Sequence, residues 1–512
     1  MILASILAIG SAMVFRGLED APAADPSQQL AQARLALDGG DLDAAGVLLR
    51  EVEGQLARHP HLIGAYHLLV ADHRARSVVP VRTAPANQAA QVVEAYRQAA
   101  RDGIDLDLPR RVILSQAIMA SGEEQEALVA FDALARELRG QADPVASATL
   151  AVVNEDRFAL RQRGIERLRR EGSPTAEIRR EVDLLLAEEP GLAIDAWAVL
   201  LDARLRLEDD EVTGLVQDLG LAMHRLEGRL AGSESGRVRI AWPELWVVLG
   251  HAYRQELGLP IRAIECYLIA LERLQATGEV AAEAHLSLGD LWVASARRDV
   301  TLGNLGSDLR SAEPHYSQVL AVTDATLEQT LLAEVGLLEI DVLRSNHPGI
   351  AERLERLSPL LAVSGDGVGR KARERAVSLG LEAAERGSLA AMEVPRDAAV
   401  GLFDQVAVHA DFVDRFARDP DDRRRGLEFM AVAQERSAGL MLSAHLGGED
   451  PRAAGTLERA PVEVRLEAAR RFARAAEALD LIEDSLDGDD PDRFLVLWRA
   501  ATLHDKAGAV EP

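Results

Sequence analysis

A helical pattern runs through almost the whole chain and constrains its fold more than any other feature of the sequence. From Gln29 onward, apolar residues recur at positions i, i+3, i+4 and i+7, and short breaks rich in glycine, aspartate and proline separate these stretches. The alternating pattern that is typical of strands is almost absent. The sequence therefore predicts an all-α chain of consecutive helices.

The length of the chain decides how these helices are organised. At 512 residues the chain exceeds what one hydrophobic core usually encloses. The breaks leave helix pairs of repeat size, which favours an extended array over several unrelated domains. Since only 4% of the residues are aromatic, we expect the helices to pack through leucine, alanine and valine.

The clearest repeat lies near the middle of the chain. The residues that form its pattern are Trp246, Leu249, Gly250, Tyr253, Ala263, Tyr267 and Ala270. Their spacing and residue types resemble the tetratricopeptide repeat signature. In that family, small residues let two antiparallel helices approach closely while aromatic rings fill the gaps between them. The resemblance implies a right-handed α-solenoid of antiparallel helix pairs.

Looser copies of the signature occur on both sides of this repeat. They involve Ala33, Gly40, Ala45 and Leu49, then Gly122, Ala127 and Phe131, then Leu288, Gly289, Trp292, Ala312, Tyr316 and Val319, and finally Ala478, Ile482 and Leu486. A last helix near Phe494 to Lys506 is expected to cap the array. We predict an apolar segment at 1-15, a linker at 16-28, N-terminal repeats at 29-145, degenerate helical repeats at 146-235, central repeats at 236-325, and C-terminal repeats with the capping helix at 326-512.

The resemblance also implies where a partner binds. In the family, first-helix residues one and four positions after the central small residue line a concave groove. Carried onto this chain, these positions are His251, Arg254, Asp290 and Val293 in the central repeats, and Arg34 and Gln116 in the N-terminal copies. Plain exposure to solvent is the alternative interpretation of these six side chains. The expected occupant is a peptide or a helix of another protein.

The sequence holds no pattern that predicts catalysis, a metal site or a cofactor. Cys266 is the only cysteine and no HExxH motif occurs, and the run Gly365-x-Gly367-x-Gly369 has Arg370 where a dinucleotide loop has glycine, so a turn between helices is expected. The net charge of -26 would repel a phosphate backbone, which excludes general nucleic-acid binding from our expectations.

Residues 1–15 are mostly apolar and carry no charged side chain, which indicates a signal or an anchor. As a helix, about 15 residues reach only ~22 Å, short of a ~30 Å hydrocarbon core. A cleaved signal, a true start upstream of Met1 and a buried N-terminal helix all stay open. We expect membrane attachment or export to a bacterial cell envelope, with a cytoplasmic location as the alternative.

Together these features predict a non-catalytic protein-protein interaction scaffold. The alternative is a cell-envelope enzyme similar to superhelical bacterial cell-wall lytic enzymes, in which the solenoid is an accessory arm to a divergent catalytic lobe within 326-460. Such a lobe is expected to contain strands, whereas a continued array contains helices alone.

Overall fold

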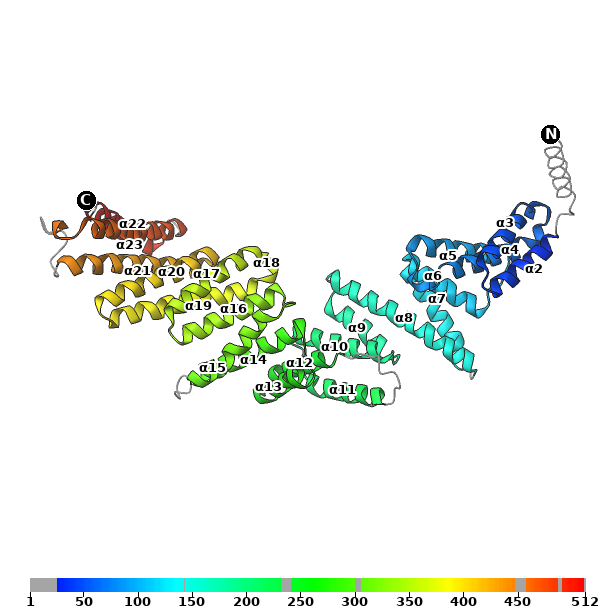
Figure 1. The fold of residues 1–512 in the computed structure, drawn as a ribbon. Coiled ribbons are helices and arrows are strands. Elements are labelled where there is room, and N and C mark those ends of the chain that lie inside the picture. Colours follow the sequence, from blue (N-terminus) through cyan, green and yellow to red (C-terminus); the bar gives the residue numbers. More distant parts are fainter. Residues whose placement is uncertain are drawn as a thin grey trace, which may run out of the picture. The chain divides into compact units, whose positions relative to one another are not determined.

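The computed structural model describes residues 25–141, 143–231, 241–299, 305–446, 457–486 and 490–510. Within these ranges every regular element is a helix and no strand occurs, which confirms the predicted all-α class (Figure 1). The chain divides into two units, one of Met1–Asp209 and His224–Ile240 and one of Asp210–Met223 and Ala241–Pro512. The two units share helix α11 (Leu215–Ala231).

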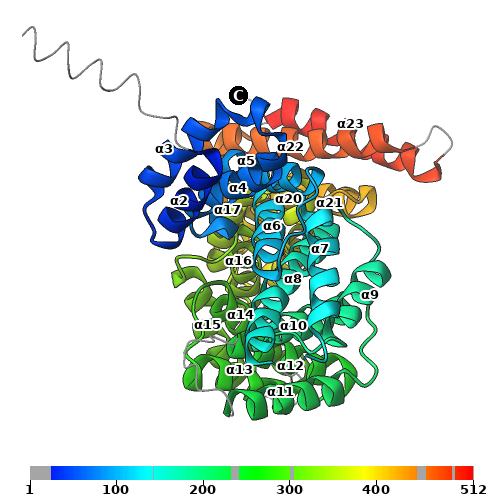
Figure 2. The same ribbon diagram turned by 90° about the vertical axis from the view of Figure 1, so that its right-hand side faces the viewer.

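The first unit is a series of helices in which successive members pack against each other. They are α2 (Pro26–Asp38), α3 (Leu42–Glu53), α4 (Ile63–Ser77), α5 (Ala86–Arg101), α6 (Leu108–Ser121), α7 (Glu124–Leu138), α8 (Pro144–Arg170), α9 (Thr175–Leu186) and α10 (Leu192–Glu208), with short 3-10 turns at Leu56–Arg58, Pro60–Leu62 and Val81–Thr83. Figure 2 shows α6, α7 and α8 side by side. Buried alanine, leucine and valine side chains fill the contacts between them.

Local sequence signals explain where these helices begin and end. Asp25 caps α2 by accepting a hydrogen bond from the Ser27 backbone, and Pro26 occupies the first turn, where its missing N–H has no helical partner to lose. Residues 26–28 therefore belong to the first helix, so the predicted linker at 16-28 extends three residues too far. Gly122 ends α6 in the left-handed conformation, with a φ of 96°.

The second unit continues the same kind of pairing. Its helices are α12 (Trp242–Glu256), α13 (Pro260–Leu268), α14 (Gly278–Asp299), α15 (Leu305–Ala321), α16 (Leu327–Leu343), α17 (His347–Val363), α18 (Gly365–Val368), α19 (Arg370–Glu393), α20 (Arg396–Phe416), α21 (Pro420–Leu446), α22 (Val462–Ser485) and α23 (Pro491–Val510), with a π-helical turn at Ile269–Arg273 and a 3-10 turn at Leu457–Arg459. Helix pairs form from α12 with α13, α14 with α15, α16 with α17, α19 with α20 and α21 with α22.

The first helices of these pairs lie next to one another and form what we call the first-helix layer. It contains α12, α14, α16, α19 and α21, each in contact with the next. Helix α16 is the most enclosed, because every residue from Ala333 to Leu343 is buried. Three carboxylates, Glu334, Glu339 and Asp341, are buried with them, so their charges need partners.

The region 326-460 was the predicted place for a catalytic lobe in the alternative interpretation. Its described residues form helices α16 to α21, which continue the pairs, and contain no strand. The glycine run at 365–369 forms the short helix α18 and the turn into α19, as predicted. The apolar segment at 1-15 lies outside the described residues. Among the residues that are described, no helix is long and apolar enough to cross a membrane.

Candidate functional site in the first-helix layer

The predicted repeat signature forms a tight contact between α12 and α13. Tyr267, Ala263 and Ala270 are fully buried in one core. A Cβ atom at Gly250 would lie 2.6 Å from a ring carbon of Tyr267, closer than side chains can pack. The central small residue of the signature is therefore glycine because the tyrosine ring lies directly on the helix backbone.

The next pair repeats this contact and extends it to a third helix. A Cβ atom at Gly289 in α14 would lie 2.7 Å from the ring of Tyr316 in α15, and one at Gly336 in α16 would lie 2.3 Å from the same ring. Tyr316 is fully buried. The ring therefore joins its own pair to the following one, as the family resemblance predicts for neighbouring repeats.

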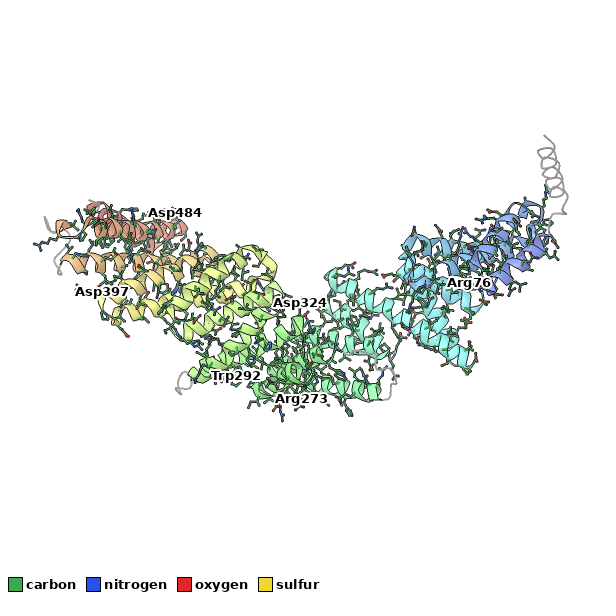
Figure 3. The ribbon with its side chains drawn as sticks, viewed as in Figure 1. Arg76, Arg273, Trp292, Asp324, Asp397 and Asp484 are labelled. Carbon is green, nitrogen blue, oxygen red and sulfur yellow. The ribbon has the colours of Figure 1, made fainter. Side chains whose placement is uncertain are left out.

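The larger aromatic residues of the signature lie at the edge of these cores. Trp246 and Tyr253 are half-buried beside the core of α12 and α13, while Leu249 is buried. Trp292 on α14 is also half-buried (Figure 3). In the looser copies of the first unit, by contrast, the small residues Ala33, Ala45 and Ala127 and the aromatic Phe131 are all fully buried.

His251, the first predicted groove residue, has an internal role. The Tyr267 hydroxyl donates to His251 Nδ1 over 2.9 Å, and His251 Nε2 donates to Glu283 Oε1 over 3.0 Å. Arg254, one helical turn further on, is exposed and forms no ion pair or hydrogen bond with other described residues. Of the two positions in this repeat, only Arg254 is free to meet a partner.

The two predicted positions in α14 are not free. Asp290 accepts a hydrogen bond from the Tyr316 hydroxyl over 2.7 Å and lies 3.3 Å from the guanidinium of Arg375 in α19. Val293 is 2% exposed and lies in the core between α14, α15 and α16, so the expectation that it lines a groove is wrong. The family rule fails here because α14 is covered by neighbouring helices on the side where the rule assumes solvent.

The two N-terminal positions differ from each other. Arg34 on α2 is exposed and has no hydrogen bond to another described residue. Gln116 on α6 is half-buried and donates to Asp156 Oδ2 over 2.7 Å. Burial raises the pKa of Asp156, against the opposing effects of Gln116 and Arg82.

One arrangement that sequence reasoning missed recurs in both units. In the first unit, the hydroxyl of Tyr96 on α5 donates to Asp72 on α4 over 2.9 Å. Asp72 also forms an ion pair with Arg110 on α6 over 2.7 Å. Asp72 directly follows a fully buried alanine, just as His251 and Asp290 directly follow glycines. The residue after the central small position therefore serves three times as the acceptor for the second-helix tyrosine. The sequence feature that could have predicted this hydrogen bond is a tyrosine at the aromatic position of the second helix, because its buried hydroxyl needs an acceptor.

Charged side chains of three first helices meet in what we call the charged junction. It consists of Asp290 and Arg297 on α14, Glu339 on α16, and Arg375, Glu382 and Arg386 on α19. Glu339 lies between two guanidinium groups, 2.5 Å from Arg297 Nε and 3.0 Å from Arg375 Nε. Burial lowers the pKa of Arg375, but the charges of Asp290 and Glu339 outweigh burial and hold the pKa above its usual value.

The charged junction is electrically balanced, since three guanidinium groups face three carboxylates. Its donors and acceptors satisfy one another, so it leaves no spare charge for a phosphate or a carboxylate ligand. We interpret it as the link between the pairs and not as a binding site.

Two other features bear on chemistry. Cys266 is buried, and burial raises the pKa of its thiol to about 12, so the thiolate form is disfavoured. No group of three or more histidine, cysteine, aspartate or glutamate side chains suited to a metal ion occurs within the described ranges.

The last helix, α23, lies where the capping helix was predicted, but its outer face is not polar. Ala500, Leu503 and Val510 are buried against the preceding helices. Phe494 is 78% exposed and Trp498 is 61% exposed, and the helical repeat places both opposite the buried face. Leu495 and Leu497 are exposed beside them. We call these four side chains the α23 apolar face.

No family model matches the chain. No curated protein matches it either. Solved structures that resemble it include a human IFIT1 dimer with m7Gppp-AAAA, with 12% identity, coverage of 92% of this chain and 88% of that chain, and a TM-score of 0.35. Another is Naa15/Naa10 bound to HypK-THB, with 10% identity, 94% and 79% coverage and a TM-score of 0.28. A circular tandem repeat protein with novel repeat topology has 14% identity, 95% coverage of both chains and a TM-score of 0.16.

Proposed function

We propose that this chain is a non-catalytic scaffold that binds an amphipathic helix of a partner protein. The observation that carries the proposal is the α23 apolar face. Phe494 and Trp498 expose large aromatic rings on the side of α23 opposite its buried face. Contiguous exposed apolar side chains mark interaction surfaces, and tryptophan and other aromatics are the usual anchors.

A helix is the occupant that fits this face best. Within the second unit, α21, α22 and α23 pack against one another in sequence, helix on helix. Phe494 and Trp498 are four residues apart, so they form a ridge that a partner helix can receive between its own apolar side chains. A partner helix would continue the stacking that holds the array together.

The predicted groove supports the proposal less than the α23 apolar face does, because most of its residues are buried or bound to other side chains of the chain. Asp290 and His251 hold tyrosines of their own pairs, and Val293 is buried. Charge reversal at Asp290 would therefore disturb the fold and not report on a partner. Arg34 and Arg254 are exposed, and their involvement in binding stays a prediction, as does the expected lack of affinity for nucleic acid.

Partner retention by full-length variants tests the proposal. The double variant Phe494→Glu, Trp498→Glu places two charges on the α23 apolar face. When each chain is used as bait in a lysate of the cells that naturally produce it, we expect the wild type to retain the partner protein and the double variant not to retain it. The matched control is Leu389→Glu, Met392→Glu, which changes two exposed apolar side chains on α19. Equal retention by both variants would overturn the proposal. So would a wild-type dimer that becomes a monomer in the α23 variant, because the occupant would then be a second copy.

We also propose that residues 1–15 take the chain to a membrane or out of the cytoplasm. The support is their apolar composition without a charged side chain. Cell fractionation compares the full chain with a version that starts at Asp25, the first described residue. We expect only the full chain in the membrane or exported fraction. Both versions in the soluble cytoplasmic fraction would contradict this.

A further inference from the structure

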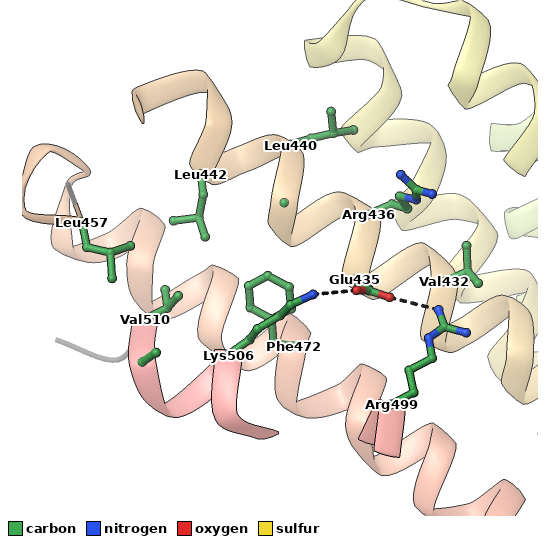
Figure 4. Close-up of a pocket in the computed structure, with 12 residues that line it drawn as sticks. Val432, Glu435, Arg436, Leu440, Leu442, Leu457, Phe472, Arg499, Lys506 and Val510 are labelled. Atoms are coloured by element: carbon green, nitrogen blue, oxygen red, sulfur yellow. Dashed lines mark hydrogen bonds and ion pairs between the residues drawn. The ribbon is translucent and has the colours of Figure 1, made fainter. Parts of the chain in front are cut away.

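A cavity of about 570 Å³ lies between α21, α22 and α23 of the second unit (Figure 4). One end of it is apolar. Leu442 on α21 and Val510 on α23 line this end and are buried, and Leu457 adjoins them. The buried ring of Phe472 on α22 lies where the apolar end meets the charged end, with its centroid 5.6 Å from Lys506 Nζ (Figure 4). The volume is within the range of small-molecule sites, about 300 to 1,000 Å³.

The other end of the cavity is charged. Glu435 on α21 lies 2.8 Å from Lys506 Nζ and 3.0 Å from an Arg499 guanidinium nitrogen, and both cations belong to α23. Arg436 also lines the cavity, but it is exposed and its side chain points away from Glu435, Arg499 and Lys506 (Figure 4). Glu435 is the only carboxylate among the lining residues, so Arg499 and Lys506 leave one positive charge in excess at this end. This excess occurs in a chain with a net charge of -26.

The position of Glu435 shows that a carboxylate fits between these cations. Burial raises the pKa of Glu435, but its hydrogen bonds with Lys506 and Arg499 outweigh burial and hold the pKa below its usual value. The charged end therefore stabilises a carboxylate anion, and its one surplus positive charge favours a second carboxylate beside the first.

We propose that this cavity binds a single-chain aliphatic carboxylate, with the alkyl chain against Leu442, Phe472 and Val510 and the carboxylate beside Arg499 and Lys506. The size agrees. With about 30 Å³ for each heavy atom, similar to a water molecule in the liquid, a ten-carbon carboxylate needs about 360 Å³. The site is independent of the α23 apolar face, whose aromatic rings point away from the buried side of the helix.

Calorimetric titration of the full chain with decanoate and with 1-decanol tests the proposal. We expect one saturable site for decanoate and about tenfold weaker binding of decanol, because the alcohol lacks the charge-assisted hydrogen bonds. Glu435→Gln removes the competing internal carboxylate and should tighten decanoate binding several-fold while leaving decanol unchanged. Equal affinities for the two probes, or an unchanged ratio in Glu435→Gln, would overturn the carboxylate assignment.

A second variant tests the location. Gly439 lines the cavity, and a Cβ atom there would meet nothing within 4 Å, so Gly439→Phe puts a ring into open space without a clash at the backbone. We expect this variant to bind decanoate at least tenfold more weakly and to unfold at an unchanged temperature. Gly401→Phe is the matched control, because Gly401 is an exposed helical glycine of α20 with equally open surroundings. Undiminished binding by Gly439→Phe would overturn the site.

Discussion

At the scale of single residues, three tyrosines hold helix pairs together in the same way. Tyr96, Tyr267 and Tyr316 are each fully buried, and each hydroxyl has an acceptor on the preceding first helix. A buried hydroxyl without an acceptor would be costly, so the acceptor is needed wherever the second helix carries tyrosine and not phenylalanine. These positions therefore contribute to stability and not to recognition.

The contact between Tyr316 and Gly336 gives a sharp prediction. Replacement of a helical glycine by alanine normally raises the free energy of unfolding by about 0.5 to 1 kcal/mol. In Gly336→Ala the new methyl group would lie 2.3 Å from a fully buried ring that Asp290 holds in place, so we expect a loss of about 1 to 3 kcal/mol. Urea denaturation measures both effects. Gly401→Ala, in open space, should stabilise the chain, and the same sign for both variants would contradict the packing described here.

Two buried histidines predict how stability depends on pH. His409 is fully buried and stacks on His347, with ring centroids 5.9 Å apart. Burial, assisted by His347, lowers the pKa of His409 to about 3, from about 6.5 in the unfolded chain. The unfolded state therefore takes up the proton first. The contribution of neutral His409 to the stability of the folded state is therefore complete above pH 6.5. It is lost at about 1.4 kcal/mol per pH unit as the pH falls from 6.5 toward 3.

The substitution His409→Leu should make this loss of stability shallower. Urea denaturation at pH 7 and pH 5 measures the difference for the wild type and the variant. The control His445→Leu changes an exposed histidine of α21 and should leave the pH dependence as it is. An identical pH dependence in the wild type and His409→Leu would show that this imidazole does not titrate as its burial requires.

At the scale of helices, the charged junction connects three first helices through Glu339. Removal of one member of a buried ion pair costs about 3 to 5 kcal/mol, and the partial exposure of Arg375 and Arg297 places Glu339→Gln at the lower end, about 3 kcal/mol. Glu313→Gln breaks the exposed pair with Arg344 and should cost at most about 1 kcal/mol. Denaturation midpoints compare the two variants. Similar small losses in both would mean that the junction contributes little to the stability of the array.

Sequence patterns predicted the helices and the small-residue contacts because both arise from residues close together in the chain. The Gly250 and Tyr267 contact joins neighbouring helices, and its spacing is visible in the sequence. The ion pair of Asp290 with Arg375 joins residues 85 positions apart, and the local sequence of neither helix predicts it. The expectation for Val293 failed for a related reason, because exposure of a helix face depends on which later helices cover it.

At the scale of the whole molecule, the chain is an array of helix pairs in two units, and both surfaces that we propose for binding lie in helices α21 to α23 of the second unit. The α23 apolar face lies on a single helix, whereas the cavity beside it is lined from α21, α22 and α23. Neither was predicted, because a capping helix is expected to be polar outside and because the cavity is lined from three helices. The absence of catalytic function stays a prediction.

Site-specific photo-crosslinking in living cells tests the central claim, that the α23 apolar face binds a partner protein. The photoreactive residue p-benzoylphenylalanine replaces Phe494, Trp498 or, as a control, the exposed Leu389 of α19. We expect the same partner protein to be crosslinked from positions 494 and 498 and not from 389. Crosslinks to no protein, to a second copy of the chain alone, or to the same proteins from all three positions would contradict the claim.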